Sequence, residues 1–288
     1  MEIPGARIQV DSFKRGSDAY FLSHFHADHM ANLRCGWNRG PLYASKVTGN
    51  LLVHSERADK QALRIIEPGD SITIDAGGPV TVKAIEANHC PGALMFVFET
   101  SCGRILYTGD FRYDVELHRP LAALGGFDLA FVDNTYDHPH YVFPSQAETI
   151  RHVVALAEKN PQKDLFLGLY TIGKTRLLSA LAHRFEKRFY VPPDIYRAYK
   201  AMGAENLVTP EKSSTNFFGY CLGYFSKYFK MNYPDYRSKA LVIIPTGWAL
   251  DNTSRDGYHY VAYSEHCDWR ERQAFLAMLG AGKVINLR

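Results

Sequence analysis

The sequence predicts an α/β protein, a sandwich of strands and helices that is interrupted by an inserted α/β segment. The first half consists of short runs rich in β-branched and aromatic residues, separated by Gly and Pro, which is typical of strands joined by tight turns. After Pro144 the apolar residues take helical spacing, and helices then alternate with strands. The last residues again indicate strand, helix and strand, so we expect them to rejoin the first sandwich.

Most elements expected in the first half are strands. They are residues 7–11, 19–23, 71–75, 80–87, 93–100 and 104–110, with a helix over 45–63 and a buried strand at 128–133. The second half is expected to contain a helix after Pro144, a strand at 164–169, a helix at 174–187, a strand containing A-L-V-I-I-P, a strand at 257–264, a helix at 268–279 and a last strand V-I-N-L. The aromatic residues of 217–229 are expected to be core or a helix packing face, with base stacking a less favoured alternative.

Composition argues against a membrane-spanning or secreted protein. No run of about 18 apolar residues occurs, so we expect no membrane span. The first residues lack the charged-then-apolar layout of a secretory signal. The five cysteines are odd in number and form no C-x-x-C pair, which indicates reduced thiols in a reducing compartment.

The positive charge is concentrated in the middle of the chain. Residues 141–250 contain 15 Lys and Arg against 8 Asp and Glu, a balance of +7, and the remainder contains 18 against 22, a balance of −4. The two sum to the net charge of +3. A basic middle segment favours contact with phosphates, although a chance imbalance of surface charge would give the same count.

The strongest chemical signal is the cluster H-F-H-A-D-H at residues 24–29, directly after a predicted strand. A tight loop can turn His24, His26, Asp28 and His29 inward together, whereas one face of a strand or helix cannot use this spacing. Imidazole and carboxylate are the ligands of zinc sites that keep a position open for water. Four such ligands suggest two metals, one served by the first two histidines and the other by the aspartate and the third histidine.

One loop cannot complete two coordination spheres, and further candidates lie at the ends of other predicted strands. His89 in A-N-H-C-P-G, Asp110 in Y-T-G-D-F-R and His266 in Y-S-E-H-C each follow a strand. The two oxygens of Asp110 could bridge both ions. Asp11, also at a strand end, is expected to orient a ligand rather than bind metal. Cys90 beside His89 is expected to be a small packed residue.

Together these motifs resemble the metallo-β-lactamase superfamily. The further stretches N-H-C-P-G-A, L-Y-T-G-D-F-R-Y, V-D-N-T-Y, G-x-Y-x-x-G-K, P-T-G-W and Y-S-E-H-C are similar to its β-CASP branch, and within it to the DNA interstrand-cross-link-repair nucleases of the Apollo and Artemis group. The resemblance implies an αββα sandwich with an inserted β-CASP domain. We therefore expect residues 1–140 and 240–288 to form the metallo-β-lactamase domain and residues 141–239 the insertion, with the active site at their interface.

The resemblance also implies two zinc ions, although Mn²⁺ and Fe²⁺ suit the same ligands. By matching position, the implied ligands of the first ion are His24, His26, His89 and Asp110, and those of the second are Asp28, His29, Asp110 and His266. Asp133 matches the acidic residue that opens the β-CASP region. The catalytic residues implied are Asp28, Asp110, Asp133 and His266, with the last two orienting the site and transferring a proton.

The family's exonuclease members carry a pocket for a 5′-phosphate. The matching positions here are Tyr136, Lys174 and Ser264, with Asp133 close by. Because the Gly-Lys and the Ser are both kept, the resemblance implies a 5′-to-3′ exonuclease that acts on DNA with a 5′-phosphate end during repair. It also implies a nuclear location if the source is eukaryotic, and a cytoplasmic one otherwise.

Three other functions are compatible with parts of the sequence. Residues 168–175, G-L-Y-T-I-G-K-T, fit the P-loop of nucleotide hydrolases, but an ATPase would leave the metal cluster unexplained. An RNA-processing β-CASP enzyme would use the same metals. A small-molecule hydrolase of this fold is less favoured, because the basic insertion would then have no purpose.

Overall fold

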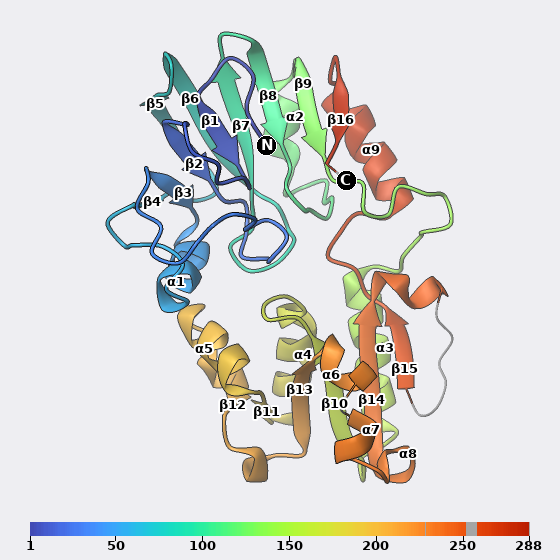
Figure 1. Cartoon of the computed structure of the whole chain (residues 1–288). Helices are drawn as coiled ribbons and strands as arrows, with labels where there is room; N and C mark the ends of the chain where they lie inside the picture. Colours follow the sequence, from blue (N-terminus) through green and yellow to red (C-terminus); the bar gives the residue numbers. More distant parts are fainter. Residues whose placement is uncertain (228, 252–257, 288) are drawn as a thin grey trace. The chain divides into compact units, whose positions relative to one another are not determined.

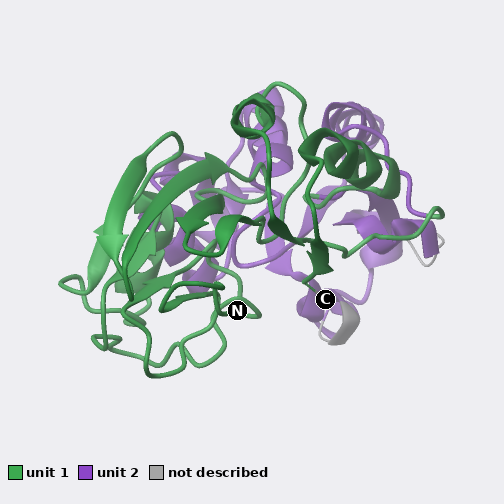
Figure 2. Ribbon diagram, turned by 90° about the horizontal axis from the view of Figure 1, so that it is seen from above, with its two compact units in different colours: residues 1–140, 265–288 green, residues 141–264 purple. Residues whose placement is uncertain are grey.

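The computed structural model describes residues 1–227, 229–251 and 258–287, which form two compact units. Unit 1 comprises residues 1–140 and 265–288, and unit 2 comprises residues 141–264 (Figure 2). Among the described residues, no helix has the length and apolar character needed to cross a membrane.

Unit 1 contains two sheets. The first has four parallel strands, β1 (Ile8–Val10), β2 (Ala19–Phe21), β3 (Leu42–Ala44) and β4 (Leu63–Ile65). The second has six strands in the order β16 (Val284–Asn286), β9 (Leu129–Val132), β8 (Gly103–Tyr107), β7 (Leu94–Thr100), β6 (Pro79–Glu86) and β5 (Ser71–Asp75). Strands β5 to β8 are antiparallel neighbours, whereas β9 and β16 join in parallel (Figure 1).

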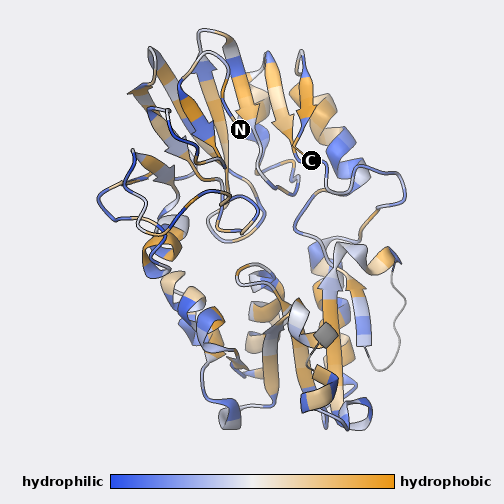
Figure 3. Ribbon diagram, in the orientation of Figure 1, coloured by the Kyte–Doolittle hydropathy of each residue, from blue (hydrophilic) through white to orange (hydrophobic). Residues whose placement is uncertain are grey.

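The two sheets of unit 1 pack face to face through one apolar core. Phe21 of β2 contacts Phe96 and Phe98 of β7, with ring centroids 5.1 and 5.3 Å apart. Strand β6 alternates buried and partly exposed residues along most of its length, as a strand with one covered face should. The central strands carry the most apolar residues, as Figure 3 shows. Burial of these side chains therefore fixes the register of both sheets.

Three helices complete unit 1, namely α1 (Lys46–His54), α2 (Arg119–Leu124) and α9 (Trp269–Leu279). Ser45 begins α1 by accepting a hydrogen bond from the backbone N–H of Thr48. Asp268 begins α9 in a capping box with Glu271. Leu52 of α1 joins the apolar cluster of β2 and β3. The resulting fold is the predicted mixed α/β sandwich.

Unit 2 contains one six-stranded sheet in which every pairing is parallel. Its order is β12 (Val208–Thr209), β11 (Phe189–Tyr190), β13 (Phe217–Cys221), β10 (Asp164–Leu169), β14 (Ala240–Thr246) and β15 (Tyr258–Ala262). Its helices are α3 (Gln146–Glu158), α4 (Thr175–Phe185), α5 (Pro193–Ala201), α6 (Leu222–Lys227), α7 (Phe229–Asn232), α8 (Tyr236–Lys239) and the 3₁₀ turns η1 (Glu205–Leu207), η2 (Lys212–Ser214) and η3 (Gly247–Asp251). Parallel sheets need apolar cover on both faces, and two separate core clusters supply it.

Two sequence expectations differ from the structure. The helix expected over 45–63 ends at His54, because the chain turns through a left-handed conformation at Glu56 and reaches β4 by residue 63. The return to the first domain was expected at residue 240, but β14 pairs with β10 and β15 pairs with β14, so the return comes at Glu265. Pairing between strands that lie far apart in the sequence decides this boundary, and such pairing leaves no signal in the local sequence.

The aromatic stretch 217–229 was expected to be core, and five of its members are buried. They are Phe217, Phe218, Tyr220, Phe225 and Phe229. Tyr228 lies outside the described residues, as does Gly257 at the start of the strand expected over 257–264.

Candidate metal centre

The first three histidines of the centre converge on one point. His24 follows β2 and is fully buried, and its Nε2 lies 2.8 Å from Nδ1 of His26. The same Nδ1 lies 3.3 Å from Nε2 of His89, which follows β6. Ligands about 2.1 Å from a tetrahedral zinc lie about 3.4 Å from one another. Three nitrogens at this spacing match one metal position.

Asp110 stands between this group and the other predicted ligands. Its Oδ2 lies 3.8 Å from Nε2 of His24, 3.9 Å from Nε2 of His89 and 3.9 Å from Nε2 of His266. Its Oδ1 lies 3.3 Å from Nε2 of His29. One buried carboxylate therefore faces four imidazoles, which is the position that a bridging ligand requires.

Asp28 and Cys90 lie beside these histidines, the first exposed and the second buried, as expected of a small packed residue. The carboxylate of Asp28 is 60% exposed, and its Oδ2 lies 3.7 Å from Nε2 of His29, so it stands at the mouth of the cluster. Cys90 is buried, and its Sγ lies within 4.8 Å of the ligand atoms of His24, His26 and His89. Burial raises the pKa of the Cys90 thiol well above its usual value, which keeps the thiol protonated at neutral pH.

Asp11 orients the residues of the centre through hydrogen bonds. Its Oδ2 lies 2.6 Å from Nδ1 of His29 and accepts from the hydroxyls of Ser23, at 2.6 Å, and Tyr107, at 3.0 Å. Its Oδ1 accepts from the backbone N–H of Ser23 at 2.8 Å. The Ser23 hydroxyl also lies 2.9 Å from Nδ1 of His24. Sequence reasoning placed Asp11 here but missed Ser23 and Tyr107, which carry no metal chemistry of their own.

The remaining histidines are oriented in the same way. Nδ1 of His89 lies 2.8 Å from the carbonyl oxygen of Glu265, and Nδ1 of His266 lies 2.7 Å from Oδ2 of Asp133. Oδ1 of Asp133 accepts from the backbone N–H and the hydroxyl of Thr135. Four histidines thus have Nδ1 engaged and Nε2 turned toward the centre. Such outer contacts fix the ring orientation and tautomer of metal-binding histidines.

Arg272 fixes the loop that carries Asp133, and sequence reasoning missed it. Its Nε donates to the carbonyl oxygen of Asp133 at 2.9 Å, and its Nη1 pairs with Asp137 at 3.1 Å. Its Nη2 donates to Oδ1 of Asn286 in β16 at 2.6 Å. One buried guanidinium from α9 thereby ties this loop to the edge of the sheet.

The charges of the centre suit divalent cations. Burial lowers the pKa of His29, but the carboxylates of Asp11 and Asp110 outweigh burial and raise this pKa to about 11. Burial and neighbouring imidazoles hold the pKa of His24 and of His89 well below 6.5. The proton on His29 therefore offsets carboxylate charge that a bound metal ion would otherwise neutralise.

Below neutral pH, the free energy of unfolding should depend on the protonation of His24 and His89. Both have a folded-state pKa below the unfolded value of 6.5. Below that pH the unfolded chain takes up protons that the folded, metal-free chain does not, so the free energy of unfolding should fall by about 1.4 kcal/mol per pH unit for each residue. His29 does not offset this loss, because its raised pKa keeps it protonated in both states there.

This contribution is complete above pH 6.5 and is lost as the pH falls toward the folded-state pKa. Urea unfolding of metal-free protein at about pH 6.5, 6.0 and 5.5, a range over which His29 becomes protonated in both states, measures it. The variant His24→Gln should lose about 1.4 kcal/mol per pH unit of the slope. The remainder belongs to His89 and to His118 and His259, whose pKa burial also lowers. A free energy of unfolding that did not change over this range would contradict the buried, neutral state of both histidines.

The residues matched to a 5′-phosphate pocket lie in both units. Tyr136 belongs to unit 1, with its ring centroid 5.9 Å from that of His266. Lys174 and Ser264 belong to unit 2, and both are buried. Lys174 lies at the start of α4 in a left-handed conformation. The carbonyl oxygen of Ser264 accepts from Nε2 of Gln146 at 2.9 Å.

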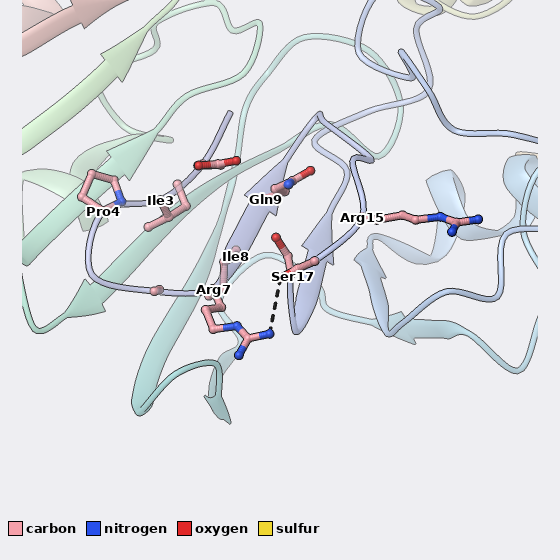
Figure 4. A pocket seen from close by; sticks show the side chains of 10 residues that line it. Ile3, Pro4, Arg7, Ile8, Gln9, Arg15 and Ser17 are labelled. Carbon is pink, nitrogen blue, oxygen red and sulfur yellow. Dashed lines mark hydrogen bonds between the residues drawn. The ribbon is translucent and has the colours of Figure 1, made fainter.

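A separate cavity of about 390 Å³ lies in unit 1. It is lined by the N-terminal segment and by the turn that precedes β2, among them Arg7, Gln9 and Arg15 (Figure 4). None of the predicted metal ligands lines it, so we do not assign it to the metal centre.

Comparison with known proteins agrees with this geometry. Residues 6–166 match the family model of the β-lactamase superfamily domain. The chain is 33% identical to "5′ exonuclease Apollo" of Gallus gallus over 98% of its own length and 62% of that protein. It is 31% identical to "DNA cross-link repair 1A protein" of Mus musculus, over 98% of its own length and 30% of that protein.

The fold and the metal centre thus define a protein of the metallo-β-lactamase superfamily. Within that superfamily, the relatives that the chain resembles along nearly its whole length include proteins named for 5′ exonuclease activity and for DNA cross-link repair. The chain spans less than two thirds of the length of the two relatives named above. A crystal structure of a protein of unknown function from Enterococcus faecalis V583 shares the fold, with a TM-score of 0.63 at 17% identity, over 96% of this chain and 76% of that one.

Proposed function

We propose that this chain is a zinc-dependent 5′-to-3′ exonuclease that hydrolyses DNA phosphodiester bonds from a 5′-phosphate end. The observation that carries the proposal is the buried carboxylate of Asp110 facing four imidazoles whose other ring nitrogens are already engaged. The relatives named as a 5′ exonuclease and a DNA cross-link repair protein support DNA as the substrate. In a eukaryotic cell, this substrate would place the protein in the nucleus.

The donor set fits two metal ions. His24, His26, His89 and Asp110 would hold one ion, and Asp28, His29, Asp110 and His266 the other. When bound, two divalent ions supply a water acidic enough to ionise near neutral pH and neutralise charge on the phosphate oxygens. Zinc is the favoured ion, with Mn²⁺ and Fe²⁺ as alternatives that accept the same ligands.

The chain's own residues have three further tasks. Asp11 and Ser23 hold His29 and His24 in the orientation that presents Nε2. Asp133 holds His266 through Nδ1, which keeps Nε2 of His266 presented to the metal position. Asp28, whose Oδ2 lies 3.7 Å from Nε2 of His29, would complete the ligands of the second ion from the exposed side.

We propose that the 5′-phosphate binds at the start of α4. The ammonium of Lys174 supplies charge there, and backbone N–H groups at a helix start favour anions. The hydroxyl of Thr175, the first residue of α4, is buried and finds no hydrogen-bond partner within the part of the chain that the structure describes. A phosphate oxygen would satisfy it. Ser264, in the same unit as Lys174, would complete the pocket.

The test is digestion of 3′-labelled oligonucleotides that carry either a 5′-phosphate or a 5′-hydroxyl. Purified protein with about two zinc ions per chain should produce a stepwise ladder that favours the 5′-phosphate and disappears with chelator. RNA of the same sequence should be cut more slowly. Preferential cutting of RNA would assign the chain to RNA processing, and no cutting of either polymer by metal-loaded protein would refute the nuclease.

A further inference from the structure

The loop that joins β10 to α4 exposes an aromatic ring beside the proposed phosphate site. Tyr170 directly follows β10, and 45% of its surface is exposed. Among the described residues, neither of the two core clusters that cover the sheet of unit 2 includes it. Large aromatic side chains bury readily, so an exposed ring at the end of a parallel strand, where such sheets bind ligands, calls for a functional explanation.

The ring of Tyr170 lies close to the ammonium of Lys174, which would bind the phosphate. Nζ of Lys174 lies 5.4 Å from the Tyr170 ring centroid and 5.1 Å from that of Tyr263. Tyr263 is 1% exposed and Lys174 is 5% exposed. One of the two rings that face the ammonium is therefore buried, and the other is open to solvent. Attraction between the Lys174 ammonium and both rings holds the ammonium in position.

We propose that Tyr170 stacks on the base of the 5′-terminal nucleotide while Lys174 binds that nucleotide's phosphate. This inference rests on the phosphate site of the proposed function. A base lies one sugar away from its own 5′-phosphate, so a ring adjoining the phosphate-binding ammonium is within reach of that base. Stacking on an aromatic ring accepts every base, because every base has a π-face.

Two residues then recognise the 5′ end of the DNA in different ways. Lys174 selects the end by its phosphate, and Tyr170 adds affinity that does not depend on sequence. An exonuclease that meets a new terminal base after every cut needs this combination. The same residue would also keep the terminal nucleotide unpaired from its complement, because a base stacked on Tyr170 has left its neighbours in the duplex.

The test measures binding to four ends of one single-stranded oligonucleotide. The ends carry a 5′-phosphate or a 5′-hydroxyl, each with a normal or an abasic first nucleotide, and phosphorothioate linkages slow hydrolysis. Fluorescence anisotropy with metal-loaded protein gives each Kd. Wild-type protein should bind the phosphorylated end with a base about tenfold more tightly than the phosphorylated abasic end. Tyr170→Leu should bring this ratio to about one and keep the preference for phosphate, whereas Tyr170→Phe should keep both.

Phe185→Leu is the matched control, because Phe185 lies at the other end of α4 and faces a cation too, with Cζ of Arg184 5.9 Å from its ring centroid. It should leave the ratio unchanged. Equal weakening of base-bearing and abasic ends by Tyr170→Leu would overturn the inference and leave the ring as a support for Lys174. Equal binding of phosphate and hydroxyl ends by wild-type protein would instead overturn the phosphate site itself.

Discussion

Replacing Asp110 with Asn is expected to lower hydrolysis of DNA by about a thousandfold or more and to remove at least one of the two metal ions. The carboxylate faces four imidazoles at 3.3 to 3.9 Å, and an amide has the same shape without the charge. Charges on His266 and His29 offset the effect of burial and hold the pKa of Asp110 well below its usual range. The carboxylate is therefore ionised and ready to bind metal at neutral pH.

Metal content per chain and the rate of digestion should be measured on the same preparation of the Asp110→Asn variant. Asp114→Asn is the matched control, because Asp114 is an exposed carboxylate four residues away whose Oδ1 accepts a hydrogen bond from Leu117. The control should retain wild-type metal content and rate. If Asp110→Asn bound two metals and cut DNA at the wild-type rate, Asp110 would not be a bridging ligand.

The convergence of the histidines and aspartates of the centre could be predicted from sequence, because metal binding restricts residue type. Few residue types bind zinc, and the spacing H-x-H-x-D-H is too dense for any regular element to display on one face. The contacts that orient these ligands left no such signal. Tyr107 reaches Asp11 from another strand, and Glu265 contributes only a backbone carbonyl to His89. Hydroxyls and carbonyls are present throughout any chain, so tertiary packing alone selects these.

The C-terminal boundary of unit 2 could not be predicted from the sequence for a similar reason. The strand beginning at Ala240 is apolar as far as Pro245 and buried throughout, which suits the middle of any parallel sheet. Its pairing with β10, about 75 residues earlier, is what assigns it to unit 2. The return of the chain at Glu265 then places His266 in unit 1 with the other ligands. All the proposed ligands consequently lie within unit 1, although the last of them follows the whole of unit 2 in sequence.

Replacing Lys174 with Glu is expected to abolish the preference for 5′-phosphate ends while leaving both metals bound. A hydrogen bond to a charged group contributes about 1.5–3 kcal/mol, and reversing the charge adds repulsion. The loss in kcat/KM on 5′-phosphate ends should therefore be about a hundredfold or more, with little change on 5′-hydroxyl ends. Metal content should stay at the wild-type value, because every proposed ligand lies in unit 1 and Lys174 lies in unit 2.

Lys174 is 5% exposed and adopts a positive φ of 57°, so the Glu variant is also at risk of misfolding. Lys174→Met keeps most of the aliphatic stem against Tyr263 without the charge and should lose the same preference. Lys174→Arg should restore part of it, because a guanidinium binds phosphate. A Met variant that folds, binds metal and still prefers the 5′-phosphate would show that the end is read elsewhere. Activity lost equally on both ends would instead indicate that Lys174 supports the general binding of DNA.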